Sequence, residues 1–228
     1  MTGLFTFAFG YGTLMGLLKL NEDRLVFPVM PWPRALELPD PSLGLYPVRI
    51  ETTTADGVRL VGWRMQSGRA PRRPWLLMFH GNGGDVSSSG RPEHYRALLR
   101  LGLNLLAFDY RGYGESEGRP SEAGVYRDAD AAYAYLRDTL GVPPERIVIF
   151  GHSLGSAVAV DLASRVPARA LVVEGALTSV PDVGQRTYFF LPVRLLARNR
   201  FASAEKIGRV TIPKLFLHAR WDEVIPFD

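Results

Sequence analysis

Short apolar runs without polar alternation recur along the chain. Three of them are Trp75–Phe79, Leu103–Phe108 and Ile147–Phe150. A strand with one face in water alternates apolar and polar residues, whereas a strand covered on both faces does not. These runs therefore predict central strands of a sheet that has helices on both of its faces.

An earlier pair of runs predicts a hairpin. Val48–Thr54 and Val58–Met65 are rich in strand-forming residues, and the residues between them, Ala55 to Gly57, are typical of a turn. Later patterns predict helices at Glu93–Leu101 and Glu122–Leu140, and strands at Ala170–Val173 and Lys214–His218. Strands and helices that alternate after an opening hairpin predict an α/β fold with a mostly parallel, doubly wound sheet.

Residues 1–20 form a separate apolar segment. No charged residue occurs from Thr2 to Leu18, and Lys19 follows directly. The length of this segment is near the minimum of ~17 residues for a membrane-spanning helix. A secretory signal has a basic residue before its apolar stretch, and no basic residue precedes this one. We therefore expect an uncleaved membrane anchor and a membrane-associated protein. The alternative is an apolar helix on the domain's own surface, since Gly10 and Gly12 weaken a free-standing helix.

Prolines crowd the next segment. Six of them lie between residues 27 and 47, and such a density disfavours regular structure. We therefore expect an extended connector over residues 21–47 and a folded domain over residues 48–228.

The sequence Gly151-His152-Ser153-Leu154-Gly155 joins a predicted strand to a helix of small residues. In that context Gly-x-Ser-x-Gly is a nucleophile elbow, a turn so sharp that the serine is held in strained backbone geometry. The helix that follows directs its first N–H groups toward the reaction site. Ser153 is therefore the candidate nucleophile, and the Leu154 N–H is a candidate donor to the charge that develops on a substrate carbonyl oxygen.

A glycine-rich turn, residues 80–84, follows the first central strand. Acyl transfer requires a second N–H donor opposite Leu154, and glycines let the main chain approach a carbonyl oxygen closely. The Asn82 N–H is the predicted second donor, with Gly83 as the neighbouring possibility. His80 is expected to brace this loop and not to act as a base.

Asp222 follows the last predicted strand and is the candidate acid of a catalytic triad. A serine hydroxyl needs a histidine that removes its proton, and that histidine needs a carboxylate that orients it. Glu174, at the end of another strand, is the second choice for the acid. The loop Asp109–Ser116 also ends a strand, and we expect it to have a structural role.

The histidine of the triad is not found where the chain order requires it. Hydrolases of this architecture have the order serine, acid, histidine, so the base is expected after Asp222. The four histidines of the sequence all precede that position: His80, His94, His152 and His218. We therefore expect the base, with a final strand, beyond Asp228, and weak or no turnover from residues 1–228 alone.

The composition excludes several kinds of chemistry. The sequence of 228 residues has no cysteine, which excludes disulfides, thiolate catalysis and cysteine-ligated zinc. The net charge is +4, and the arginines are scattered, so nucleic-acid binding is not indicated. No metal and no organic cofactor is implied.

Together these motifs resemble the α/β-hydrolase superfamily, in particular its membrane-anchored single-domain branch. The resemblance covers residues 24–228 and rests on four motifs in order, at residues 79–84, 109–116, 151–155 and 218–226. It implies that Ser153 is the nucleophile and Asp222 the acid. It also implies an oxyanion hole made by the main-chain N–H groups of Asn82 and Leu154. The branch's last strand, helix and histidine are absent from the sequence.

The resemblance implies a cap at about residues 180–208, in which the apolar stretch Tyr188–Leu196 fits an acyl pocket, a membrane-facing surface or a buried helix. Substrates of the family include acylglycerols, other lipids, acyl-protein thioesters and peptides. The leading hypothesis is therefore a serine hydrolase that cleaves an ester, thioester or amide of a small-molecule or lipid substrate through an acyl-enzyme on Ser153. The alternative is a catalytically silent member that binds a lipid or a partner through the same pocket.

Overall fold

The computed structural model describes residues 2–29, 44–66, 73–88, 90–225 and 227, with side chains from Phe9 onward. In these residues the strands are β1 (Val48–Thr53), β2 (Arg59–Met65), β3 (Trp75–Phe79), β4 (Asn104–Phe108), β5 (Ile147–His152), β6 (Ala170–Glu174) and β7 (Lys214–Leu217). The α-helices are α1 (Thr2–Leu20), α2 (Glu22–Val26), α3 (Arg91–Arg100), α4 (Glu122–Ala134), α5 (Leu154–Ala163), α6 (Val180–Thr187), α7 (Val193–Leu196) and α8 (Ser203–Lys206). Short turns of other helix types lie at Tyr135–Thr139, Pro144–Arg146 and Ile207–Arg209.

The strands form one sheet in the order β1-β2-β4-β3-β5-β6-β7. The predicted hairpin is confirmed, because β1 and β2 pair antiparallel from Thr53 opposite Arg59 outward. β2 also pairs antiparallel with β4, whereas every later pairing is parallel. The fold class predicted from the sequence, a mostly parallel sheet that opens with an antiparallel pair, is therefore confirmed.

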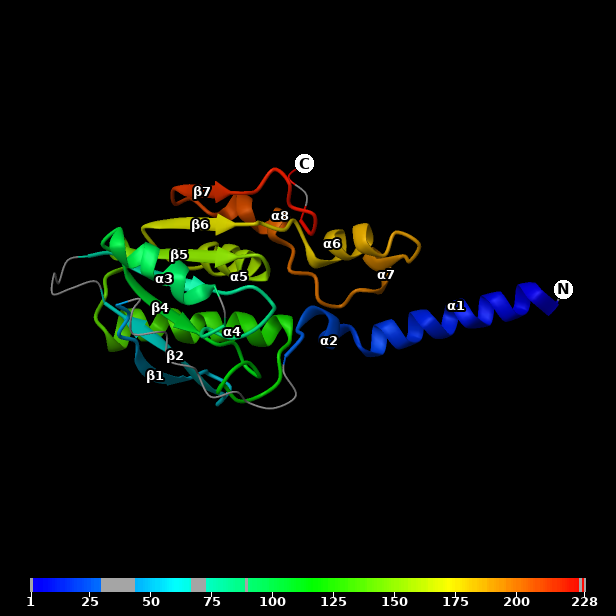
Figure 1. Ribbon diagram of the computed structural model, residues 1–228, viewed down its shortest axis with the longest axis horizontal. Coiled ribbons are helices and arrows are strands. Elements are labelled where there is room, and N and C mark those ends of the chain that lie inside the picture. Colours follow the sequence, from blue (N-terminus) through cyan, green and yellow to red (C-terminus); the bar gives the residue numbers. More distant parts are fainter. Residues whose placement is uncertain (1, 30–43, 67–72, 89, 226, 228) are drawn as a thin grey trace.

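The unbroken apolar runs have a simple cause. In β3, Trp75, Leu77 and Phe79 pack into the core on the side of α4 and α5. The alternate residues Leu76 and Met78 pack into a second core with Tyr95 of α3. Figure 1 shows α4 and α5 on one face of the sheet and α3 on the other. Because both faces are covered, apolar side chains are needed at every position of this strand.

The predicted helix over Glu122–Leu140 is one helix with a change of type. α4 begins after Ser121, whose Oγ accepts a hydrogen bond from the Gly124 N–H at 3.2 Å. This is an N-cap contact, which satisfies one of the free donors of the first turn. The helix continues through Tyr135–Thr139 as a π turn.

The N-terminal segment is a long helix that extends away from the body of the molecule. Figure 1 shows α1 running outward from α2, with the N-terminus at its far end. Phe9 and Leu17 on α1 are 78% and 55% exposed. Among the helices whose residues the structure describes, none is both long and apolar enough to cross a membrane.

The connector expected over residues 21–47 begins with regular structure. α2 is helical, and Phe27 directly after it is only 1% exposed. The Phe27 ring meets Phe201 edge to face, with ring centroids 5.9 Å apart. The start of the connector is therefore packed into the body of the protein, and residues 30–43 lie outside the described part of the chain.

Candidate active site

Ser153 stands at the turn from β5 into α5 in a backbone conformation that non-glycine residues rarely adopt. Its φ is 53° and its ψ is −122°. The Ser153 N–H donates to the carbonyl oxygen of Glu174 at 2.9 Å, and the Ser153 carbonyl accepts from the Ser156 N–H at 2.8 Å. These contacts on both sides hold the strained turn in place.

The two glycines of the motif are required by packing. A Cβ at Gly155 would overlap the carbonyl oxygen of Phe79 on β3, and a Cβ at Gly151 would overlap the main chain of Gly155. Helix α5 can therefore lie this close to the sheet only because both positions lack a side chain. This arrangement is the strand, turn and helix context that the motif needs to present a serine.

The two predicted oxyanion donors lie on the same cavity as Ser153. Asn82, after β3, and Leu154, at the first position of α5, both line this cavity. The Asn82 loop is held by two hydrogen bonds, one to the main chain of Asn82 and one from its side chain. The Tyr113 hydroxyl donates to the Asn82 carbonyl at 2.9 Å, and the Asn82 Nδ2 donates to the Val26 carbonyl at 3.2 Å.

Asp222 lies near the elbow, in the loop after β7. One carboxylate oxygen, Oδ1, accepts from the Val224 N–H at 2.9 Å and from the Ile225 N–H at 2.8 Å. These main-chain donors, Ile225 foremost, hold the pKa of Asp222 below its ordinary value. A Cβ placed on Gly175 would lie 3.9 Å from Asp222 Oδ2 and 4.0 Å from the Ser153 nitrogen. Asp222 and Ser153 therefore both lie next to Gly175.

The second choice for the acid, Glu174, meets the elbow through its main chain, because its carbonyl accepts the Ser153 N–H. The Asp109 loop is structural, as expected. Asp109 is fully buried, its Oδ1 accepts from the Val86 N–H at 2.8 Å, and its burial raises its pKa. It therefore fixes the loop that follows the predicted oxyanion residues.

His80 braces the same region. Its Nδ1 lies 2.7 Å from the carbonyl oxygen of Gly81, and its Nε2 lies 3.3 Å from Asp109 Oδ1. Its ring also lies against Tyr110, with centroids 4.3 Å apart. Because both ring nitrogens face protein oxygens and the side chain is buried, His80 holds the loop in place, as the sequence predicted.

The remaining histidines also have other contacts. His94 on α3 meets Phe150 edge to face, and His218 Nε2 lies 2.6 Å from the Ile225 carbonyl. Partial burial lowers the pKa of His152, which precedes Ser153 in the chain. Within the described residues, no histidine is hydrogen-bonded to Ser153. The expectation that the base follows Asp222 stays a prediction.

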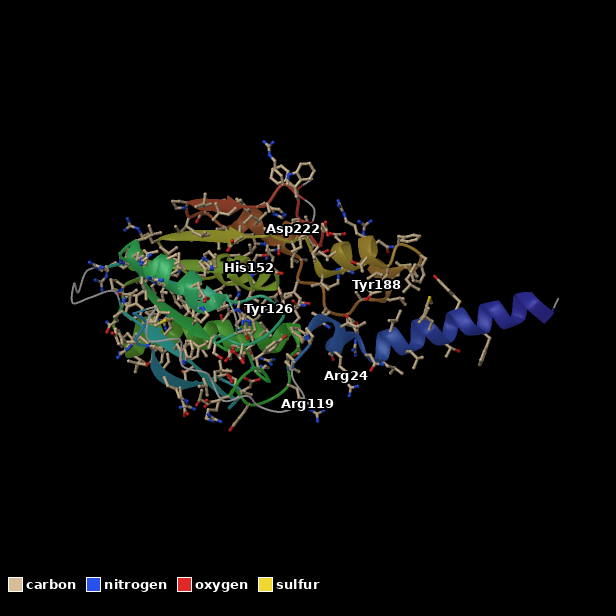
Figure 2. The ribbon with its side chains drawn as sticks, viewed as in Figure 1. Arg24, Arg119, Tyr126, His152, Tyr188 and Asp222 are labelled. Carbon is tan, nitrogen blue, oxygen red and sulfur yellow. The ribbon has the colours of Figure 1, made fainter. Side chains whose placement is uncertain are left out.

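A cavity of about 320 Å³ opens at Ser153. Most of its lining is aliphatic or aromatic, and it comes from the α1–α2 junction, from α6 and α7, and from the loop that follows Asp222. Its apolar residues include Leu18, Leu25, Val26, Leu177, Val183, Tyr188, Leu191, Leu196 and Ile225. Figure 2 shows Tyr188 on the α6–α7 side and Arg24 on α2, both beyond the end of the sheet where His152 and Asp222 lie.

Sequence reasoning missed one wall of this cavity. Leu18, Leu25 and Val26 lie in the segments expected to be an anchor and a connector, yet they line the same space as Ser153. No pattern near these residues points to a site, because the contacts that bring them there come from positions far away in the sequence.

The chain belongs to the alpha/beta hydrolase fold family, which matches residues 74–212. Among solved structures, it is similar to the Pyrococcus furiosus esterase Pf2001, with a TM-score of 0.70 and 25% identity. That match covers 86% of this chain and 79% of the esterase.

Relatives in sequence come from bacteria and vertebrates. The chain is 42% identical to the uncharacterized protein Rv2307c of Mycobacterium tuberculosis, over 90% of this chain and 72% of that protein. It is 37% identical to the alpha/beta hydrolase domain-containing protein 17B of Xenopus tropicalis and 36% identical to the lysophosphatidylserine lipase ABHD12 of Danio rerio. The chain spans only 54% and 44% of those two proteins. The family, the esterase and the lipase together support hydrolase activity in general.

Proposed function

We propose that this protein is a serine hydrolase that cleaves an ester, thioester or amide through an acyl-enzyme on Ser153. The observation that carries the proposal is the strained backbone of Ser153, at φ 53°, beside a cavity that Asn82 and Leu154 also line. Strain of this kind persists only where the surrounding structure maintains it, and it is concentrated at functional sites.

The reaction follows from the roles of these groups. Ser153 Oγ attacks the substrate carbonyl carbon, its proton passes to a histidine, and the carbonyl oxygen becomes an oxyanion. The N–H groups of Asn82 and Leu154 donate to that oxyanion. The tetrahedral intermediate then expels the alcohol, thiol or amine, which takes the proton from the histidine and leaves an acyl group on Ser153. Water, activated by the same histidine, releases the acid and restores the serine.

Asp222 acts through that histidine. A carboxylate beside the imidazole fixes its tautomer and stabilises the cation that forms during attack. The low pKa of Asp222 supports this role, because the group stays ionised across the pH range in which a histidine works as a base.

The cavity supports a substrate with an apolar acyl group. Its volume of about 320 Å³ falls in the ~300–1,000 Å³ range of small-molecule sites, and its lining is mainly apolar. We therefore propose lipid esters as the leading substrate class. The lipase among the relatives is in keeping with this class.

We further propose that the protein works at a membrane surface. Apolar side chains are exposed both on α1 and on the α6–α7 segment, where Phe189 and Phe190 are 81% and 53% exposed. The two regions touch, because the Tyr11 hydroxyl donates to the Phe190 carbonyl at 2.9 Å. Exposed apolar side chains gathered beside a substrate cavity are typical of a surface that binds lipid.

The proposal is tested by hydrolysis of monoacylglycerols and of p-nitrophenyl esters. The protein is expressed from its complete reading frame, so that any histidine encoded after Asp228 is included. We expect turnover that Ser153→Ala reduces by at least about a thousandfold. Turnover that is unchanged in Ser153→Ala would refute the role of Ser153.

The second candidate function is lipid or partner binding without catalysis. It is favoured by one observation: among the described residues, no histidine is hydrogen-bonded to Ser153. It predicts that a fatty acid binds to the cavity while no ester is cleaved, even by the protein from the complete reading frame. The same experiment therefore separates the two functions.

A further inference from the structure

Residues 198–201, which follow α7, are held by an unusual set of hydrogen bonds to carboxylates. The N–H groups of Arg198 and Asn199 donate to Glu22 at 2.8 and 2.7 Å. The N–H groups of the next two residues, Arg200 and Phe201, donate to Glu122 at 2.6 and 2.9 Å. Four consecutive main-chain donors are thus satisfied by two carboxylates, one from α2 and one from the start of α4.

Glu22 makes further contacts that fix it in place. Its carboxylate also accepts from Asn199 Nδ2 at 3.1 Å and from Arg198 Nε at 3.3 Å. Glu22 is only 8% exposed. Burial alone would raise the pKa of Glu22, but the hydrogen bonds from Asn199 and Arg198 outweigh it and hold the pKa below its ordinary value. A buried carboxylate with such a set of donors is costly to detach, because each donor would lose a charged partner.

The other end of α2 reaches the predicted oxyanion loop. The Val26 carbonyl accepts the hydrogen bond from Asn82 Nδ2 at 3.2 Å. Between the two attachment points, Leu25 lines the cavity, as do Glu22 and Val26 themselves. A helix of five residues therefore connects the segment after α7 to the Asn82 loop and forms a wall of the cavity along the way.

We propose that α2 is a specificity-determining wall of the substrate cavity, and that Glu22 is the positioning residue that holds this wall against Arg198 and Asn199. This inference rests on the proposed function and concerns its substrate selection. A fixed wall keeps the apolar side chains Leu25 and Val26 in contact with a long acyl chain. When Glu22 is neutralised, the wall loosens and a long chain loses those contacts, whereas a short chain does not reach them.

The wall is tested in two steps with matched variants. Glu22→Gln removes the charge that holds α2, and Glu122→Gln removes the charge that holds the same segment to α4. Glu205→Gln removes a charge from an exposed position on α8 and serves as the surface control. All are made in the protein from the complete reading frame, and unchanged amide exchange in β3 verifies that each variant is folded.

The first readout is amide hydrogen exchange. In Glu22→Gln we expect exchange about tenfold faster over residues 22–27 and 198–199, because a charge-assisted contact is lost. In Glu122→Gln we expect faster exchange at residues 200–201 but not over residues 22–27. Equal loosening of residues 22–27 in both variants, or no loosening in Glu22→Gln, would overturn the inference.

The second readout is the rate at which alkyl fluorophosphonates label Ser153, as the ratio of a long-chain to a short-chain reagent. Both reagents use the same oxyanion hole, so a displaced Asn82 changes both rates and leaves their ratio unchanged. We expect Glu22→Gln to lower the ratio about tenfold and Glu205→Gln to leave it unaltered. A loosened α2 with an unaltered ratio would show that the wall does not select the acyl chain.

The experiments can refute the proposed catalysis by Ser153 and the inference about α2 independently of each other. If the wild-type protein is not labelled at Ser153, the proposed catalysis fails. The wall is then tested by the affinities for a long-chain and a short-chain fatty acid. A ratio of those affinities that Glu22→Gln leaves unchanged would overturn the inference, and a lowered ratio would support it.

Discussion

Gly155 on α5 lies so close to the carbonyl oxygen of Phe79 on β3 that no side chain fits between them. We therefore predict that Gly155→Ala lowers the free energy of unfolding by about 2 kcal/mol or more, since an added methyl must displace main-chain atoms. Urea denaturation measures the change. Gly208→Ala is the control, because a Cβ at Gly208 has nothing within 4 Å. Equal effects of the two substitutions would contradict the packing of the elbow.

The strained backbone of Ser153 makes a prediction about stability. At the Ser153 φ of 53°, a glycine has no backbone strain, whereas an alanine keeps the strain that the serine has. Ser153→Gly is therefore expected to be about 1 kcal/mol more stable than Ser153→Ala in thermal or urea denaturation. At Ser164, where φ is −75°, the order should reverse, because glycine only adds chain entropy to the unfolded state there. A Ser153→Ala protein at least as stable as Ser153→Gly would mean that the backbone of Ser153 is not strained.

The contacts of Glu22 make a prediction about pH. The pKa of Glu22 is lower in the folded protein than the ordinary value of 4.5, so ionised Glu22 stabilises the fold. This contribution is fully present above about pH 4.5 and is lost as the pH falls through the lower folded-state value. The difference in unfolding free energy between wild type and Glu22→Gln should thus be constant above about pH 5 and should shrink below it. A difference that grows toward acid pH would contradict the assignment.

The proposed membrane surface makes a prediction about lipid binding. Phe9→Glu and Leu17→Glu place charges on the exposed apolar side of α1, and each is expected to weaken sedimentation with anionic lipid vesicles about tenfold. Leu101→Glu is the matched control, because Leu101 is 75% exposed at the end of α3. An equal loss of binding in the control would show that charge alone, and not the α1 surface, determines the effect.

The sequence predicts the sheet well because its signals are local. The unbroken runs at Trp75–Phe79 and Ile147–Phe150 become strands covered on both faces, and the hairpin forms where Ala55 to Gly57 predict it. The loop after β3 and the turn at Ser153 are predicted by closely spaced glycines, because such spacing is typical of a sharp turn of the main chain. For these elements, a few neighbouring residues contain the information that fixes the backbone.

The rest of the site depends on contacts between distant positions. Glu22 contacts Arg198 and Asn199, which lie more than 170 residues away in the sequence. No periodic pattern of apolar and polar residues predicts such a contact. The same holds for Leu25, which stands just before the proline-rich segment and lines the cavity. A wall assembled from segments at opposite ends of the chain can be recognised only when the packed structure places them together.

The proposed role of Ser153 as the nucleophile is tested most directly by covalent labelling. A fluorophosphonate is incubated with the protein expressed from its complete reading frame, and the modified peptide is identified by mass spectrometry. We predict a single adduct on Ser153 that is absent from Ser153→Ala, while labelling of Ser156→Ala is retained. An adduct on another residue, or equal labelling of the Ser153→Ala protein, would contradict the account of this site.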